Sequence, residues 1–288
     1  MRRFEPDLIL CRGDWRQIYK TALRLRIPYL LIEHDVATLR DGGTVKEQRN
    51  EREMIENASG MILPSEDLIP YLASRYVLPP YRVIHLRPSG EDINFQPSRR
   101  KLLGLNLVYA GGLARRSRRR TGFGYRAYHG IFRAFMRAGW TVTLFPTCDN
   151  GTAVEEYRKI GCKIMKPKRY RDLLREMGKF QAGFLGYNKR GVPRQAFAYS
   201  QMARPNKTWD YLAAGIPTIA FNVGGLAKII RRGGWGVILK NLKPTTIKAL
   251  SKRLPRITNA MRKREVIERD SESLHSLLHE GLTYASHN

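Results

Sequence analysis

A lysine and an aspartate stand three residues apart in the stretch RPNKTWDYLAAGIPTIAF, which runs from Arg204 to Phe221. Pro205 is typical of the first turn of a helix and Gly215 of its C-terminal cap, and the apolar run that follows is typical of a buried strand. The sequence therefore predicts a helix of about ten residues that begins at the carboxyl edge of a parallel sheet, where ligands bind in open α/β folds.

Lys207 and Asp210 suit the binding of a nucleoside diphosphate. The free N–H groups and positive dipole at a helix start attract phosphate, and Lys207 adds a full charge. Asp210 lies about 5 Å deeper along the helix axis, where its carboxylate can accept hydrogen bonds from ribose hydroxyls. On spacing alone, the favoured alternative is an exposed ion pair worth a few tenths of a kcal/mol.

A second polar group, Glu33, His34 and Asp35, follows the apolar run that ends at Ile32. Polar residues at the carboxyl end of a strand usually face a ligand site. His34 could take a proton from an acceptor hydroxyl, and Asp35 could act as a base or orient His34. In the alternative, Asp35 caps the next helix and His34 packs in the core. We expect a structural role for Glu33.

Charge is distributed very unevenly along the 288 residues, whose formal net charge is +27. Residues 1–92 contain 14 basic and 14 acidic side chains, which leaves 38 basic and 11 acidic ones for the rest of the chain. Residues 93–148 and 211–264 contain no acidic side chain. This asymmetry indicates an anionic partner, such as nucleic acid, an anionic membrane surface or a phosphorylated substrate.

The arginine-rich segment RRSRRRTGFGYR, Arg115–Arg126, directly follows a glycine turn at Gly111–Gly112. One arginine, Arg115, is enough to bind a diphosphate through bidentate contacts. The other arginines exceed that need, and we predict that they bind a polyanionic acceptor: Arg116, Arg118, Arg119 and Arg120. The alternative is a solvated loop with no specific partner.

Short apolar runs alternate with longer amphipathic stretches throughout the chain. Expected strands form two series, at residues 7–11, 28–32, 60–64 and 81–86 and then at 105–110, 140–145, 182–186 and 218–221. Helices are expected at 15–26, 46–58, 66–76, 125–138, 155–160, 169–177 and 245–253. The alternation predicts an α/β fold with parallel sheets in two doubly wound domains, at 1–98 and 99–264, followed by a C-terminal helix within 265–288.

Four stretches resemble the GT-B glycosyltransferases that use nucleotide sugars and retain the configuration of the sugar. PNKTWDYLAAGIPTIAF resembles their donor-site signature, and LVYAGGLARR (107–116) resembles the first strand and glycine turn of their donor domain. RPSGEDINFQP (87–97) is similar to their interdomain linker, and NASGMILPSEDLIPYL (57–72) to the end of their acceptor domain. The four occur in the family's order and span nearly the whole chain.

The resemblance implies two Rossmann-like domains that face each other across a cleft, with a nucleoside-diphosphate sugar as co-substrate and no metal or other cofactor. It implies donor-binding roles for Gly111, Gly112, Arg115, Asn206, Lys207 and Asp210. Asp210 replaces the family's usual glutamate, and Met202 stands where the family has an earlier acidic residue.

The family's first strands and glycine loop have no counterpart before the run at 7–11. The resemblance therefore implies that the acceptor domain is reduced, that a second chain completes it, or that the protein binds without catalysis.

The preferred reading is an enzyme whose acceptor is a hydroxylated base of DNA, as in the DNA glycosyltransferases of bacteriophages. The alternatives are a cell-envelope lipid or polysaccharide acceptor at an anionic membrane, and a nucleic-acid-binding protein that has lost activity. We expect a cytoplasmic location, with peripheral membrane association under the membrane alternative. The sequence has no signal peptide or long apolar run, and its three cysteines are scattered.

Overall fold

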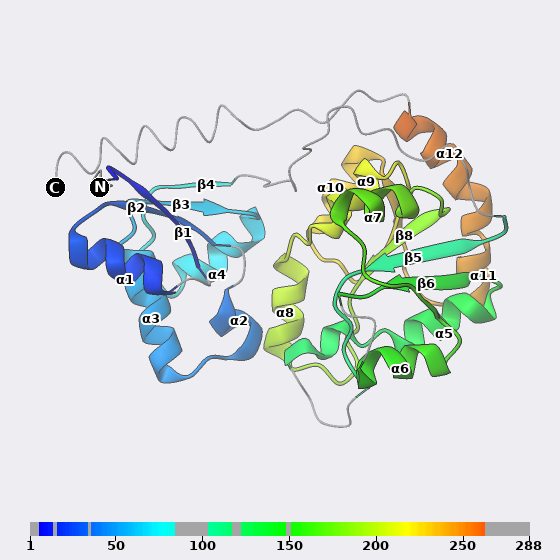
Figure 1. Ribbon diagram of the computed structural model, residues 1–288, viewed down its shortest axis with the longest axis horizontal. Helices are drawn as coiled ribbons and strands as arrows, with labels where there is room; N and C mark the ends of the chain where they lie inside the picture. The colour runs from blue at the N-terminus through cyan, green and yellow to red at the C-terminus, as the bar shows by residue number, and fades with distance from the viewer. Residues whose placement is uncertain are drawn as a thin grey trace. The chain divides into compact units, whose positions relative to one another are not determined.

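The computed structural model describes residues 6–13, 16–33, 36–83, 103–116, 122–147 and 151–262. The chain divides into two compact units (Figure 1), and the described residues fall into unit 1 at 6–83 and unit 2 at 103–262. The predicted domain boundary at 98–99 and the predicted helix within 265–288 lie outside the described residues and stay predictions.

Unit 1 contains a parallel sheet of four described strands in the order β1-β2-β3-β4. The two central strands are buried, so that Leu30, Leu31, Met61 and Ile62 have no exposed surface. Such continuous apolar burial is typical of parallel strands with cover on both faces. The strands are β1 (Ile9–Arg12), β2 (Tyr29–Ile32), β3 (Gly60–Leu63) and β4 (Tyr81–Val83).

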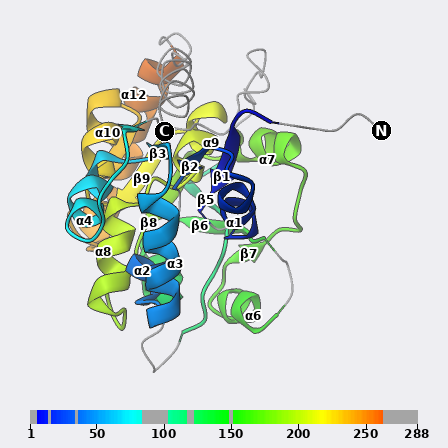
Figure 2. The same ribbon diagram turned by 90° about the vertical axis from the view of Figure 1, so that its left-hand side faces the viewer.

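A buried carboxylate joins α3 (Val45–Glu56) to α2 (Ala37–Asp41) and to the bend that follows α4 (Ile69–Ala73). Glu51 accepts hydrogen bonds from the hydroxyl and amide of Thr38 and, at 2.7 Å, from the Tyr76 hydroxyl. These bonds offset the cost of burying its charge. Figure 2 shows the neighbouring helices α1 and α3. The helical elements are α1 (Arg16–Leu25), α2 (Ala37–Asp41), α3 (Val45–Glu56), η1 (Glu66–Leu68) and α4 (Ile69–Ala73).

Unit 2 contains a parallel sheet of six described strands in the order β10-β9-β8-β5-β6-β7. The chain passes from β5 outward through β6 to β7, then crosses to β8 on the other side of β5 and continues outward. The strands are β5 (Asn106–Ala110), β6 (Thr141–Phe145), β7 (Lys163–Ile164), β8 (Ala182–Gly186), β9 (Thr218–Phe221) and β10 (Gly236–Ile238).

Helices cover both faces of the unit 2 sheet, with α5 and α6 on one face and α9 and α10 on the other (Figure 1). Phe184 of β8 lies in the core, with its ring centroid 5.4 Å from that of Phe132 and 6.0 Å from that of Phe135. The helical elements are η2 (Gly122–Arg126), α5 (His129–Arg137), α6 (Thr152–Lys159), α7 (Tyr170–Met177), α8 (Arg194–Met202), α9 (Lys207–Ala213), α10 (Leu226–Gly233), α11 (Pro244–Lys248) and α12 (Leu250–Arg262).

The structure corrects three details of the predicted elements. Helix α9 has seven residues and begins at Lys207, so Pro205 precedes it instead of occupying its first turn. The helix expected at 125–138 begins only at His129, after the 3-10 turn of η2. The helix expected at 245–253 is divided into α11 and α12, and α12 continues to Arg262 with Pro255 inside it.

Candidate functional site

The glycine turn lies at the topological switch point of the unit 2 sheet. The turn follows β5. After β5 the chain continues to β6 and β7 on one side of that strand, whereas β8, β9 and β10 lie on its other side. Ligands of doubly wound sheets bind at such a point, outside the carboxyl ends of the strands. Gly111 has φ 132°, a conformation that favours glycine, and its amide donates to the Phe145 carbonyl of β6 at 3.0 Å.

Tyr211 fixes α9 beside this turn. Its buried hydroxyl donates to the Phe184 carbonyl at 3.0 Å and lies 3.4 Å from the Ala110 amide nitrogen. The ring lies against Gly183, where a Cβ atom would collide with it. The tyrosine of the motif YLAAG thus anchors the helix to β5 and β8, and a glycine in β8 makes room for it.

Lys207 extends from the start of α9 to the glycine turn. Its Nζ lies 3.4 Å from the position that a Cβ atom of Gly111 would take. The same Nζ lies 3.4 Å from the Tyr109 hydroxyl and 4.7 Å from the centroid of that ring. The Tyr109 hydroxyl in turn donates to the Gly112 carbonyl at 2.7 Å. The lysine and the turn are therefore held together through one tyrosine.

Arg126 approaches the same turn and was not among the predicted site residues. Its Nη1 lies 3.0 Å from the position that a Cβ atom of Gly112 would take. A Cβ atom at position 112 would require the guanidinium to shift by a few tenths of an ångström, so the glycine allows this close approach. The sequence shows Arg126 only as the last residue of the arginine-rich segment, and no spacing rule distinguishes it from its neighbours.

Arg115 and Arg116 both contact Glu156 of α6. The Nε of Arg115 lies 3.4 Å from Glu156 Oε1, and the Arg116 amide donates to Oε2 at 2.8 Å. Burial acts to raise the pKa of Glu156, but the hydrogen bonds from Arg116 and Arg115 outweigh it and lower that pKa. The roles predicted for these two arginines stay predictions.

Asp210, one helical turn after Lys207, accepts a hydrogen bond from the Tyr170 hydroxyl at 2.8 Å on Oδ1. Burial raises the pKa of Asp210 from 3.8 to about 6, although the Tyr170 hydroxyl and the Lys207 charge act to lower it. Ionised Asp210 can accept further hydrogen bonds from a pair of hydroxyls. Its ionisation falls close to neutral pH, so ligand binding that needs the carboxylate will depend on pH.

The structure gives less information about the remaining predicted residues. Asn206 is exposed and is the N-cap residue of α9, without a side-chain capping bond. His34 and Asp35, like Arg118, Arg119 and Arg120, lie outside the described residues, and their roles stay predictions. Glu33 is described and buried, and its carboxylate lies against Gly13, where a Cβ atom would collide with it.

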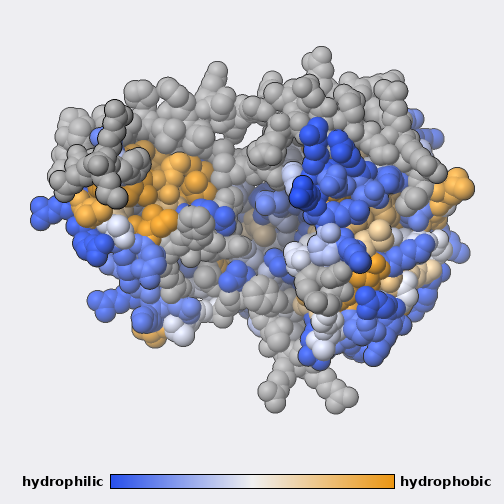
Figure 3. All heavy atoms as spheres, in the orientation of Figure 1, coloured by the Kyte–Doolittle hydropathy of each residue, from blue (hydrophilic) through white to orange (hydrophobic). Residues whose placement is uncertain are grey.

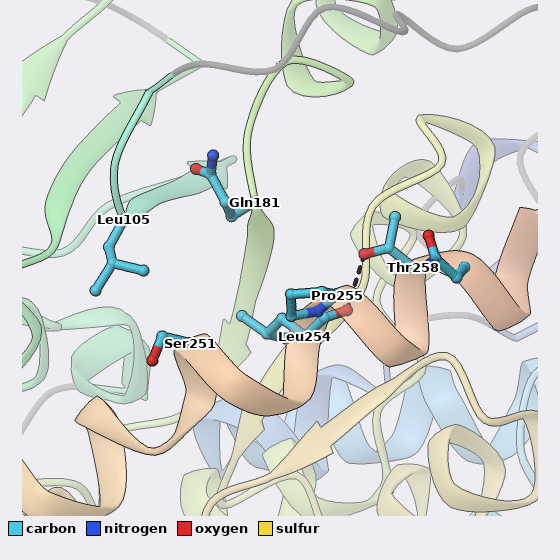
Figure 4. A pocket seen from close by; sticks show the side chains of 7 residues that line it. Leu105, Gln181, Ser251, Leu254, Pro255 and Thr258 are labelled. Carbon is cyan, nitrogen blue, oxygen red and sulfur yellow. Dashed lines mark hydrogen bonds between the residues drawn. The ribbon is translucent and has the colours of Figure 1, made fainter.

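A pocket lies at the amino-terminal edge of the unit 2 sheet, opposite to the edge at which the glycine turn lies. It borders the amino ends of β5 and β8 and the middle of α12, and Figure 4 shows its lining of Leu105, Gln181, Ser251, Leu254, Pro255 and Thr258. Asn259 completes that lining, which contains no charged side chain in the described part of the chain. A phosphate-bearing ligand would find no cation in this pocket, so the glycine turn is the better candidate.

The described residues contain neither a candidate metal site nor a candidate membrane span. No group of three or more His, Cys, Asp or Glu side chains that could hold a metal ion occurs among the described residues. Among those same residues, no helix has the length and apolar character needed to cross a membrane. The predicted independence from metals stays a prediction.

Comparison with solved structures identifies the fold. Sucrose-phosphate synthase (tll1590) from Thermosynechococcus elongatus matches with a TM-score of 0.54 and 16% identity, over 88% of this chain and 69% of that one. Anabaena Alr3699/HepE in complex with UDP-glucose matches with a TM-score of 0.58 and 14% identity, over 97% and 78%. TarM matches with a TM-score of 0.57 and 12% identity, over 95% and 54%.

No protein-family model matches the sequence, and no curated protein matches it. The structural matches show that this chain has the GT-B fold, which confirms the predicted fold class. The chain spans 54% to 78% of the length of these three structures, in agreement with the predicted reduction of the fold.

Proposed function

We propose that the protein transfers a sugar from a nucleoside-diphosphate sugar to the hydroxyl of an acceptor. The observation that carries this proposal is the approach of two cationic side chains, Lys207 and Arg126, to the glycine turn at the switch point of unit 2. Two cations beside bare backbone are suited to a diphosphate. The similarity to a structure that contains UDP-glucose supports the same ligand class.

The proposed site residues have different roles in binding the nucleotide-sugar donor and in activating it. As the bond between the sugar and the diphosphate breaks, negative charge grows on the leaving phosphate oxygens. Lys207 and Arg126 would stabilise that charge in place, which is how fixed cations accelerate such reactions. Asp210, with one oxygen bonded to Tyr170, would hold the ribose hydroxyls and so fix the nucleotide. Arg115 would assist if it exchanged Glu156 for the diphosphate.

The acceptor supplies the hydroxyl oxygen for the new glycosidic bond, and its proton must go to a base. We propose His34 for that role, with Asp35 as its partner or as the base itself. Both follow β2 of unit 1 in the sequence and belong to the predicted acceptor domain.

The strong positive charge of the second part of the chain supports a polyanionic acceptor, and we propose hydroxylated bases of DNA. A base in a duplex must leave the stack to react, while phosphate contacts supply most of the affinity. The alternative acceptor is a cell-envelope lipid or polysaccharide at an anionic membrane. A protein that binds nucleic acid without catalysis is the second alternative.

A transfer assay separates these outcomes. The purified protein is incubated with radiolabelled UDP-, GDP- and ADP-sugars, either with hydroxymethylated DNA or with a membrane lipid extract, and label in the acceptor is counted. We expect label in the DNA and none with the Lys207→Ala variant. Label in the lipid fraction alone would show that the acceptor is a membrane lipid and that the proposal of a DNA acceptor is wrong. No transfer and no hydrolysis of any nucleotide sugar would contradict the enzyme.

A further inference from the structure

The chain from β7 to the first turn of α7 carries a dense group of basic side chains with no acidic residue among them. Its sequence is KIMKPKRYR, and its five basic side chains are exposed: Lys163, Lys166, Lys168, Arg169 and Arg171. Figure 3 shows hydrophilic side chains gathered over α7. The next acidic residue in the sequence is Asp172. Its Oδ1 lies 3.6 Å from Nη1 of Arg175, so this carboxylate pairs with an arginine outside the group. We call residues 163–171 the basic strip.

The middle of the basic strip is not helical. Residues 165–169 form no helix or strand, and Arg169 has φ −59° and ψ 148°, which are polyproline-like values. Pro167 fixes its own φ in the middle of this stretch. The charges of Lys166, Lys168 and Arg169 are therefore spread along a non-helical stretch of chain. Charges spread in this way suit successive phosphates of a polymer better than one compact anion.

The basic strip ends at the candidate donor site. Tyr170, its next-to-last residue, donates a hydrogen bond to Asp210, and α7 packs against α9. The strip follows β7, and the glycine turn follows β5, so both lie at the carboxyl edge of the same parallel sheet. A polymer bound along the strip would therefore lead to the edge at which the donor is proposed to bind.

The surface of unit 2 favours a nucleic acid over a membrane. Among the described residues of this unit, the large apolar side chains that are strongly exposed are Leu103 and Tyr170. A surface that inserts into lipid needs several such residues beside its basic ones. Tyr170 is 43% exposed, and an exposed tyrosine ring in a basic stretch of sequence is suited to stacking with a nucleic acid base.

We propose that the basic strip binds a nucleic acid strand, with phosphates on Lys166, Lys168 and Arg169 and an unstacked base on the ring of Tyr170. The proposal that the strip delivers the acceptor rests on the proposed function. The proposal that the strip binds nucleic acid does not, because it is argued from the residues of the strip alone. It lies apart from the arginine-rich segment in the sequence, and its contribution can be measured separately.

The test is a salt titration of nucleic acid binding. Binding of a fluorescent 20-nucleotide single strand is followed by anisotropy from low to moderate salt, for the full chain and for the triple variant Lys166→Ser, Lys168→Ser, Arg169→Ser. Each phosphate contact on a single strand contributes about 0.7 to the slope of log K against log salt. We therefore expect the triple variant to flatten the slope by about two units.

A matched control removes the same charge at the other end of the sheet. Lys240, Lys243 and Lys248 are exposed and follow β10, which lies at the opposite edge strand from β7. Their triple change to serine should alter the slope by less than about half a unit. Equal flattening by both triple variants would overturn the proposal, because it would show only a response to net charge.

Two further measurements complete the test. Tyr170→Ala should weaken strand binding about tenfold, while Tyr170→Phe, which keeps the ring, should not. Binding to vesicles of phosphatidylglycerol and phosphatidylcholine is measured in parallel. If the strip variant loses vesicle binding and keeps strand binding, the surface is a membrane site and the proposal is wrong. If strand binding depends on the strip but no nucleotide sugar binds, the strip stands and the proposed enzyme function fails.

Discussion

The two units use parallel sheets in different ways. In unit 2 the chain reverses its direction across the sheet between β5 and β8, and the glycine turn lies at that reversal. In unit 1 the described strands follow one another in chain order, so the described part of that sheet contains no such switch point. The candidate donor side chains accordingly gather in unit 2 around a single turn.

Each unit also contains a glycine that makes room for a buried side chain. Gly183 of unit 2 lies under the ring of Tyr211, and Gly13 of unit 1 lies under the carboxylate of Glu33. A ring fixed by two backbone contacts cannot move aside, whereas the end of a glutamate side chain can rotate. The same substitution should therefore have different consequences in the two units.

The largest expected effect on stability follows from this contrast. Gly183→Ala should lower the free energy of unfolding by about 1–3 kcal/mol, because the new methyl group overpacks the core beneath Tyr211. Gly13→Ala should cost clearly less. Denaturant titration of both variants measures the difference. A larger loss in Gly13→Ala would show that Glu33 is held more rigidly than Tyr211.

The second prediction concerns the unexpected arginine of unit 2. Arg126→Ala should remove a charge-assisted contact with the diphosphate and weaken donor binding by about 1.5–3 kcal/mol, the value of a hydrogen bond to a charged group. Arg137→Ala is the matched control, since it removes an equal charge from an exposed position of α5. Calorimetry with the nucleotide sugar that binds best compares the two. Equal affinities would remove Arg126 from the site.

A smaller effect is expected from pH. The pKa of Asp210 is raised from 3.8 to about 6, chiefly by burial, so its carboxylate becomes ionised as the pH rises through about 6. If the ionised form holds the ribose, donor affinity should increase from pH 5 to pH 7 and then level off.

Stability should change with pH in the opposite sense. A carboxyl group with a raised folded pKa favours the folded state below pH 3.8, and this contribution is lost as the pH rises through about 6. Asp210→Asn should flatten both pH profiles. Wild-type and variant profiles that stay parallel would show that another group titrates.

Much of the fold follows from local sequence patterns. The apolar runs at 28–32, 60–64, 182–186 and 218–221 lie in β2, β3, β8 and β9, because strands buried on both faces leave a continuous apolar signal. Helix α8 was missed because Arg194–Met202 has no clear apolar stripe. The short strands β7 and β10, of two and three residues, were missed because they are too brief for a periodic signal.

The candidate site was only partly predictable, for a physical reason. Lys207, Gly111 and Asp210 were predicted as site residues because they belong to contiguous motifs that lie at an end of a strand or helix. Arg126 reaches the glycine turn from η2, and Tyr170 reaches Asp210 from α7, so both come from outside those contiguous motifs. Their positions depend on how the elements pack against one another. The spacing of residues in the sequence does not reveal that packing, so these two residues could not be predicted from motifs.

The central claim is that Lys207 at the glycine turn binds the diphosphate of a nucleotide sugar, and calorimetry tests it most directly. UDP-, GDP- and ADP-sugars are titrated into the full chain, into Lys207→Ala and into the control Lys240→Ala, which removes an equal charge from an exposed position. At least one nucleotide sugar should bind, and Lys207→Ala should weaken it by about 1.5–3 kcal/mol while the control binds as the wild type does. Equal affinity in all three proteins would contradict the assignment of the donor site.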